Sequence, residues 1–332
     1  MTRVSPASDA RAAPSPIPVL ALLGPTGVGK TPLAVAIAEH WPIEVVSVDS
    51  RQVYRRMDIG TAKPSLAERR AVGHHLVDVV EPDEAYDAGR FAREAASAIE
   101  TIRGRGRWPV LVGGTGLYYR ALVRGLLPRP PADRALRASI QAEARTAGSE
   151  TLHRRLQALD PAAATRLHPR DTLRVSRALE VALQTGGAVQ RSGAGAWAEA
   201  AAELRYRVVA IGLTAPRPAL YAALDARVDR MLAEGLLDEV RALLDAGFSP
   251  ALSAMQGIGY RHLAPVVTGS AALAPAVLTM KRDTRRYAKR QWTWFAREPG
   301  VTWIETVPGQ TVGALDKIKK TVERTGLFYY PD

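Results

Sequence analysis

Four short apolar runs stand out along the chain, at residues 19–23, 43–48, 109–112 and 206–213. Each has the length of a buried strand. Between the first two runs, residues 31–39 instead carry their apolar side chains at helical spacing. Strands that alternate with helices in this way predict an α/β fold built on a parallel sheet.

The middle of the chain follows a different pattern. Residues 133–184 show almost only helical spacing of Ala and Leu, Asp160-Pro161 fits a helix start, and Gly186-Gly187 fits a helix end. We therefore expect an all-helical lid domain inserted into the sheet domain. The expected divisions are a disordered tail rich in Ser, Pro and Ala at 1–16, a core at 17–127 and 205–332, and the helical insertion at 128–204.

A complete phosphate-binding loop lies between the first apolar run and the first helical segment. It consists of Gly24, Pro25, Thr26, Gly27, Val28, Gly29, Lys30 and Thr31. Glycines allow successive backbone N–H groups to point at phosphate oxygens, and the helix N-terminus adds a favourable dipole. Lys30 would reach a phosphate, and the Thr31 hydroxyl would bind Mg²⁺. The strand, loop and helix context predicts a P-loop NTPase-like core.

An acidic residue, Asp49, follows the second apolar run. The carboxyl ends of parallel strands meet at one edge of a sheet, so Asp49 is expected beside the ligand. It could be a metal ligand, a general base or a cap of the following turn. Residues 109–112 occupy the place where a P-loop ATPase usually carries its metal-binding Asp, but Gly113-Gly114-Thr115-Gly116 follows instead. A conventional ATPase is therefore disfavoured.

Composition narrows the class of protein further. Among 332 residues there is no cysteine, which excludes disulfides, thiolate catalysis and zinc–thiolate sites. No apolar stretch approaches the ~20 residues needed to cross a bilayer, so we expect a cytoplasmic enzyme with no membrane partner. His74 and His75 are interpreted as structural, because adjacent rings on a strand point to opposite faces. The net charge of +12 and the pI of about 10.2 favour a polyanionic partner.

The positive charge is concentrated near the C-terminus. Residues 281–290 hold six cations and one acid. Four of these cations would share one helical face and are predicted to contact RNA phosphates: Arg282, Arg285, Arg286 and Lys289. The aromatic side chains of 292–295 could stack on unpaired bases or pack the helix against the core.

Several blocks of the sequence, taken in order, carry a family resemblance. They lie at 24–31, 49–64, 74–76, 113–118, 160–169, 177–181, 227–237, 256–260 and 284–294. On these blocks the chain resembles the tRNA dimethylallyltransferases, or tRNA isopentenyltransferases, of bacterial type. The resemblance extends over nearly the whole chain, except 1–16, and becomes vague after Trp303.

The resemblance implies transfer of a dimethylallyl group from dimethylallyl diphosphate to the N6 amine of adenosine-37 in tRNA, with Mg²⁺, by a monomer. It implies catalytic roles for Asp49, Thr115 and Arg227, with Asp49 as proton acceptor and Lys30 and Arg227 on the diphosphate. The tRNA contacts it implies are Asp49, Ser50, Arg51, Gln52, Thr115, Arg137, Leu173, Arg174, Val175, Ser176, Arg177, Gln256, Gly257, Ile258, Gly259, Tyr260 and Arg261.

Ala223 and Leu173 depart from the family pattern, since Ala223 replaces an Arg and Leu173 a polar residue of many relatives.

Two other classes of protein share some of these features. A small-molecule kinase or a free-adenylate isopentenyltransferase would keep the loop and Asp49, but has little use for a helical lid and a basic face. A nucleotide-dependent RNA-binding protein would keep the basic face, but should carry a metal-binding Asp after Val112.

Overall fold

The chain folds into two compact units, one formed by Met1–Gly125 with Ala202–Asp332 and one by Leu126–Ala201. The computed structural model describes residues 16–126, 130, 133–187, 205–308, 310 and 312–328. Of the tail expected at 1–16, residues 1–15 lie outside the described residues. In the described part of the chain, no helix combines the length and the apolar composition that crossing a bilayer requires.

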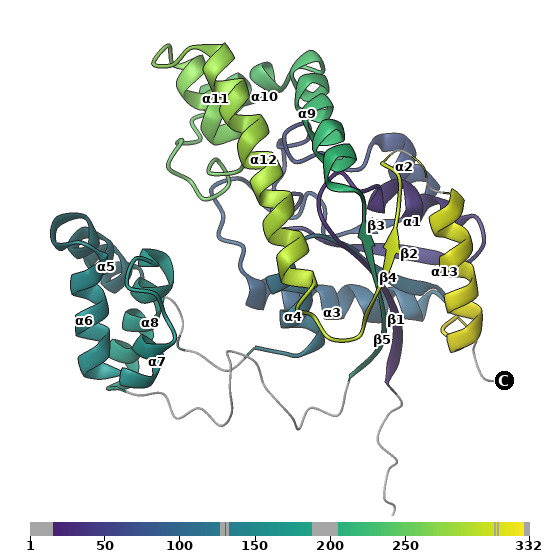
Figure 1. Cartoon of the computed structure of the whole chain (residues 1–332), viewed down its shortest axis with the longest axis horizontal. Helices are drawn as coiled ribbons and strands as arrows, with labels where there is room; N and C mark the ends of the chain where they lie inside the picture. The colour runs from purple at the N-terminus through teal and green to yellow at the C-terminus, as the bar shows by residue number, and fades with distance from the viewer. Residues whose placement is uncertain are drawn as a thin grey trace, which may run out of the picture. The chain divides into compact units, whose positions relative to one another are not determined.

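The larger unit is built on a six-stranded sheet in the order β3-β2-β4-β1-β5-β6, in which every pair is parallel (Figure 1). The strands are β1 Ile17–Leu23, β2 Ile43–Val48, β3 His74–His75, β4 Trp108–Gly113, β5 Tyr206–Thr214 and β6 Val301–Glu305. The strands expected from all four apolar runs are therefore present, and the predicted α/β class is confirmed.

Some helices of the larger unit cover the two faces of this sheet, and others pack on those helices. The helices are α1 Lys30–Ala38, α2 Leu66–Ala71, α3 Ala88–Gly104, α4 Gly116–Val123, α9 Arg217–Ala233, α10 Leu236–Asp245, α11 Tyr260–Val267, α12 Leu273–Phe295 and α13 Val312–Thr325. Leu20 and Leu22 of β1 pack in one core with α1 and α13, while Val19 and Leu23 pack in another with α3 and α4. Alternate side chains of one strand thus serve the two layers.

A third apolar core lies among α9, α10, α11 and α12. Helix α12 joins two cores, because Met280 packs in this third cluster and Phe295 packs against the sheet with α3 and α4. Glu239 of α10 fixes the segment after β2: its carboxylate accepts the backbone N–H groups of Ile59 at 2.7 Å and Gly60 at 3.1 Å, and a further N–H from Asp58. A single acid thereby anchors the backbone of residues 58–60 after β2.

The smaller unit is helical in its described part and has its own apolar core. It contains α5 Arg134–Ala147, α6 Ser149–Leu159, α7 Pro161–Thr165 and α8 Thr172–Thr185. The buried Asp160 side chain accepts the Ala163 N–H at 2.8 Å and caps α7, and Gly186 ends α8 in a left-handed conformation. Both helix boundaries predicted from the sequence are confirmed.

Candidate active site

The phosphate loop connects β1 to α1 and depends on glycine. Gly24, Gly27 and Gly29 have φ angles of 136°, 80° and 97°, a region that other residues rarely adopt. A Cβ at Gly24 would also overlap the carbonyl oxygen of Leu213 on β5. The three glycines let the chain turn sharply from the sheet into a helix N-terminus, the geometry that favours bound anions.

Lys30 folds back over this loop. Its Nζ donates to the carbonyl oxygens of Gly24 at 2.9 Å and Pro25 at 2.8 Å. Burial of the ammonium group lowers the pKa of Lys30 to about 7, with Asp49 opposing the shift and Arg227 adding to it. Within the described residues, the ammonium group donates to two neutral carbonyl groups and forms no ion pair, so an incoming anion would be its first directly bound counter-charge.

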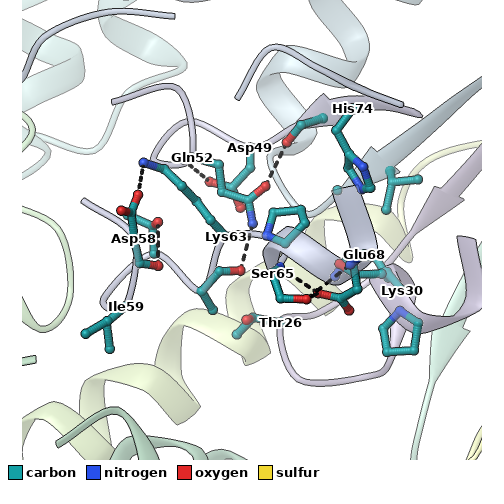
Figure 2. A pocket seen from close by; sticks show the side chains of 18 of the residues that line it. Thr26, Lys30, Asp49, Gln52, Asp58, Ile59, Lys63, Ser65, Glu68 and His74 are labelled. Atoms are coloured by element: carbon teal, nitrogen blue, oxygen red, sulfur yellow. Dashed lines mark hydrogen bonds and ion pairs between the residues drawn. The ribbon is translucent and has the colours of Figure 1, made fainter. Parts of the chain in front are cut away.

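One cavity of about 1080 Å³ is lined by five of the eight predicted loop residues, while Gly24, Pro25 and Val28 are not among its lining residues. Thr26, Lys30, Asp49 and Gln52 lie around it, as Figure 2 shows. The cavity is also lined by Gly27, Gly29, Thr31, Gly113, Gly114, Arg227 and Gln291. Its volume is ample for a diphosphate and a five-carbon chain.

Asp49 follows the last residue of β2. Its Oδ1 accepts the backbone N–H groups of Arg51 at 2.8 Å and Gln52 at 3.3 Å, so the turn-cap interpretation describes one of its oxygens. Within the described residues, no hydrogen bond is formed by the other oxygen, Oδ2. The carboxylate is therefore held by one oxygen, while the second can accept a proton.

Thr115 lies next to Asp49 at the end of β4. Its Oγ1 accepts the Ser50 N–H at 3.1 Å, and its hydroxyl is hydrogen-bonded to the phenol of Tyr287 from α12. Burial, with the negative charge of Asp49, raises the pKa of Tyr287 to about 12. No role was predicted for Tyr287. The one feature of the sequence that could have indicated a role is its position as an aromatic residue within the basic run.

Arg227 enters the cavity from α9. Burial lowers the pKa of Arg227, with a contribution from neighbouring Arg230, while Asp49 opposes the shift. Arg230 lines the cavity as well. Among the described residues, neither arginine forms an ion pair. Ala223 lies one turn earlier on α9, so the cations that α9 offers here are Arg227 and Arg230.

Another part of the cavity wall pairs its charges internally. Lys63 Nζ lies 2.6 Å from Asp58 Oδ1 and 2.5 Å from Asp78 Oδ1, and its side chain is only 2% exposed. Figure 2 shows Lys63 directed toward Asp58. Arg69 binds the other oxygen of Asp78 at 2.7 Å. These pairs hold the pKa of Asp78 below its usual value despite burial.

The residues of 50–52 and 256–261 that the resemblance assigns to tRNA differ in exposure. Gln52 is held inside the protein, since its amide accepts from the Ser47 hydroxyl at 2.9 Å and donates to the Ala62 carbonyl at 3.1 Å. Tyr260 is 1% exposed, and its phenol donates to Glu239 at 2.6 Å. Arg261 and Gln256 are exposed.

The assigned residues of the helical unit divide similarly. Leu173 is 81% exposed, whereas Val175 is fully buried in the helical core. Arg177 and Arg137 both bind the buried carboxylate of Glu180. Arg174 is exposed and Ser176 is partly buried. The assigned residues of α8 that are exposed therefore lie in its first turn.

The predicted basic face of α12 divides in the same way. Arg282, Arg286 and Lys289 are exposed. Arg285 is directed instead toward α9, where its guanidinium binds the Asp225 carboxylate at 2.6 and 2.7 Å. Arg282 and Arg286 also contact Asp283 of the same helix, at 3.2 and 3.8 Å. Three of the four predicted cations thus form an exposed basic stripe.

For the aromatic segment 292–295, packing against the core and stacking on bases were both considered. Phe295 is completely buried, and Trp294 lies against the Arg120 guanidinium, 4.9 Å from its ring centroid. Trp292 is 48% exposed and has the Trp303 ring as a neighbour at 6.5 Å. Packing therefore accounts for Phe295 and Trp294, and stacking on a base remains open for Trp292.

A parallel sheet with a glycine-rich phosphate loop after its central strand defines a P-loop fold, and Asp49 lines the same cavity as that loop. The sequence profile of the IPP transferase family matches residues 52–298, and that of isopentenyl transferases matches 17–77. The chain belongs to the IPP transferase family, and the family resemblance recognised in the sequence is confirmed.

Individual relatives agree with this assignment. The chain is 46% identical to the tRNA dimethylallyltransferase of Desulfosudis oleivorans over 92% of this chain and 95% of that one. It is 48% identical to that of Geobacter metallireducens, over 90% and 94%. A crystal structure of a tRNA isopentenylpyrophosphate transferase from Bacillus halodurans matches with a TM-score of 0.69 and 38% identity, over 94% and 96% of the two chains. The predicted P-loop NTPase-like core is confirmed.

Proposed function

We propose that the chain transfers a dimethylallyl group from dimethylallyl diphosphate to the N6 amine of adenosine-37 in tRNA, with release of diphosphate. The observation that carries this proposal is the Asp49 carboxylate, which lines the same cavity as the phosphate loop and whose Oδ2 forms no hydrogen bond within the described residues. A carboxylate beside a phosphate site suits a reaction in which an amine loses its proton as a diphosphate departs. The named relatives favour this activity over a kinase.

The phosphate loop would bind the diphosphate of the donor. Backbone N–H groups at the start of α1 would hold its oxygens, and Lys30 and Arg227 would supply positive charge. Neither cation forms an ion pair with a carboxylate among the described residues, so both are available. Charge that grows on the departing diphosphate would be stabilised by groups already in place, which is the main electrostatic contribution an enzyme can make.

A magnesium ion fits this site on the chemistry of its donors. Thr31 lines the cavity at the first turn of α1. The described residues contain no cluster of three or more His, Cys, Asp or Glu that could hold a metal. Mg²⁺ typically keeps several waters and binds substrate phosphates with few protein ligands. We propose that the Thr31 hydroxyl would hold such an ion, which would neutralise diphosphate charge when bound.

The transfer step balances with the residues described. The N6 nitrogen forms a bond to the allylic carbon, the bond from that carbon to the diphosphate oxygen breaks, and the N6 proton passes to Oδ2 of Asp49. Thr115 holds the backbone next to Asp49 by accepting the Ser50 N–H. It would orient either the adenine amine or the Asp49 carboxylate that accepts its proton. Tyr287 would keep Thr115 in position.

The tRNA would bind over the basic stripe of Arg282, Arg286 and Lys289. Its target adenosine must leave the stacked loop to reach Asp49, so base flipping is required. We assign the helical insertion the role of a lid on the anticodon stem-loop, with Leu173 and Arg174 among its exposed residues. The enzyme would act as a monomer in the cytoplasm, where unmodified tRNA is its partner.

The test is transfer of label from radiolabelled dimethylallyl diphosphate to unmodified tRNA in the presence of Mg²⁺. We expect label at the adenosine beside the anticodon, with none on AMP and no phosphate released from ATP. Label on AMP, or phosphate release from ATP without label on tRNA, would instead establish one of the alternative activities.

A further inference from the structure

Gln291 is a buried amide that contacts two separate segments of the phosphate site. It lies near the end of α12 and is 5% exposed. Its Oε1 accepts the backbone N–H of Thr26 at 2.8 Å, and its Nε2 donates to the carbonyl oxygen of Gly114 at 3.0 Å. One side chain thus joins the phosphate loop to the segment that follows β4.

The contact with Thr26 decides which loop amides can reach an anion. Phosphate loops bind their ligand through backbone N–H groups directed into the loop. In this chain the Thr26 N–H is directed to the Gln291 oxygen, while Lys30 binds the carbonyl oxygens of Gly24 and Pro25. The Gln291 amide and the Lys30 ammonium therefore fix the first half of the loop from its two sides.

The contact with Gly114 requires both residues as they are. A Cβ at Gly114 would overlap Nε2 of Gln291, so the close approach depends on glycine at this position. The amide is also the suitable group at residue 291. It accepts from Thr26 and donates to Gly114 without adding charge, whereas a carboxylate would repel both the Gly114 carbonyl and the diphosphate.

We infer that Gln291 is a positioning residue for the donor, which sets the shape of the phosphate loop so that it accepts a diphosphate. The inference rests on the proposed assignment of this loop to the diphosphate. It also means that α12 serves both substrates, since Arg286 and Lys289 of the basic stripe lie within two turns of Gln291 on the same helix.

The test compares three variants on α12 and its loop contact. Gln291→Leu keeps the approximate volume but removes both hydrogen bonds. Gln291→Glu keeps an acceptor for Thr26 and adds a negative charge. Thr293→Ala is the matched control, because within the described residues the Thr293 hydroxyl bonds only to the Lys289 carbonyl of its own helix, at 2.9 Å. For each variant, inorganic diphosphate binding, donor KM, kcat and thermal unfolding are measured on the full chain.

We expect Gln291→Leu to raise the diphosphate Kd and the donor KM by about tenfold, while kcat changes by less than about threefold. Gln291→Glu should raise both constants further, and Thr293→Ala should match the wild type. A Gln291→Leu protein that is folded at the assay temperature and binds diphosphate like the wild type would overturn the inference, whatever its melting temperature.

Lys30→Ala separates this inference from the assignment beneath it. If Lys30→Ala weakens diphosphate binding and Gln291→Leu does not, only the positioning role fails. If neither substitution changes diphosphate binding, the diphosphate does not bind at this loop, and the proposed site fails with it.

Discussion

Two lysines line the same cavity, and their surroundings give them different tasks. Lys30 donates to two backbone carbonyl groups, and burial lowers its pKa to about 7. Lys63 is bound by the carboxylates of Asp58 and Asp78. A buried ammonium whose hydrogen-bond partners are neutral has no directly bound counter-charge and is available to an anion, whereas a paired one is already neutralised and stabilises the wall. Pairing therefore separates ligand-binding cations from structural ones more clearly than burial does.

The largest difference is expected between substitutions of the two carboxylates Asp49 and Asp78, one of which should affect turnover and the other stability. Asp49→Asn keeps an oxygen that can accept the Arg51 and Gln52 N–H groups, but removes the proton acceptor. We expect turnover to fall by ~10²-fold or more, with tRNA binding nearly unchanged. Single-turnover transfer to tRNA measures the loss. Asp78→Asn is the comparison and should lose stability instead. Undiminished turnover in Asp49→Asn would exclude Asp49 as the base.

Lys63→Met should act on stability. It removes one cation from both acids, although Arg69 still binds Asp78, and because both acids are partly exposed we expect a loss of about 2–3 kcal/mol in the free energy of unfolding, below the full cost of breaking a buried pair. Urea denaturation measures it. The interpretation of Lys63 as a structural cation requires a near-normal donor KM in the folded variant, so a raised KM with full stability would reverse it.

Lys30→Ala should act on the donor. No carboxylate loses a partner, so unfolding should change little, while the donor KM should rise by about tenfold or more as one diphosphate cation is removed. Initial rates at varied donor concentration provide the measurement. An unchanged dependence on donor concentration would remove Lys30 from the diphosphate site.

On α12 the contrast is between exposed cations and one cation that is bound to another helix, because Arg286 itself contacts Asp283 of α12 at 3.8 Å. Arg286→Ala combined with Lys289→Ala should reduce the slope of log binding constant against log salt by about one to two units, because both side chains are exposed. Arg285→Ala should reduce it less, since Asp225 already binds that guanidinium. Filter binding of tRNA at several salt concentrations tests this. Equal slopes for the double variant and the wild type would place RNA elsewhere.

The smallest expected effect is the uptake of less than one proton when diphosphate binds. With its pKa lowered to about 7, Lys30 is largely neutral at pH 8 in the free protein and protonated at pH 6. A bound diphosphate raises that pKa, so binding should take up less than one proton at pH 8, and affinity should fall as pH rises above 7. Calorimetry in two buffers of different ionisation enthalpy measures the uptake. Lys30→Ala should abolish it; equal uptake in both proteins would assign the proton to another group.

The parts of the site that are local in sequence could be predicted from it. The glycine spacing of 24–29 and the position of Asp49 after an apolar run identify their own surroundings, because the next strand and helix fix them. Gln291 and Glu239 could not be found in this way. Each acts on a backbone far away in the chain, and neither residue differs in the sequence from an ordinary helix-surface side chain.

The sequence could not show which cations of the basic face are exposed and which one is bound by an acid of another helix. Helical spacing places Arg285 with Arg282 and Lys289, but it does not show that Asp225 of another helix lies opposite. Likewise, the block that contains Tyr260 matches the family pattern, while its burial against Glu239 depends on how α10 and α11 pack.

The place of β1 in the sheet has a consequence for how the protein is made. β1 pairs with β4 on one side and with β5 on the other, and β5 follows the entire helical unit in the sequence. While the ribosome is still adding β5, one edge of β1 has no partner strand, although the helical unit already has all the residues of its own core. We expect the inserted unit to fold first on the ribosome, and the larger unit to close around the growing chain only after residue 214 has emerged.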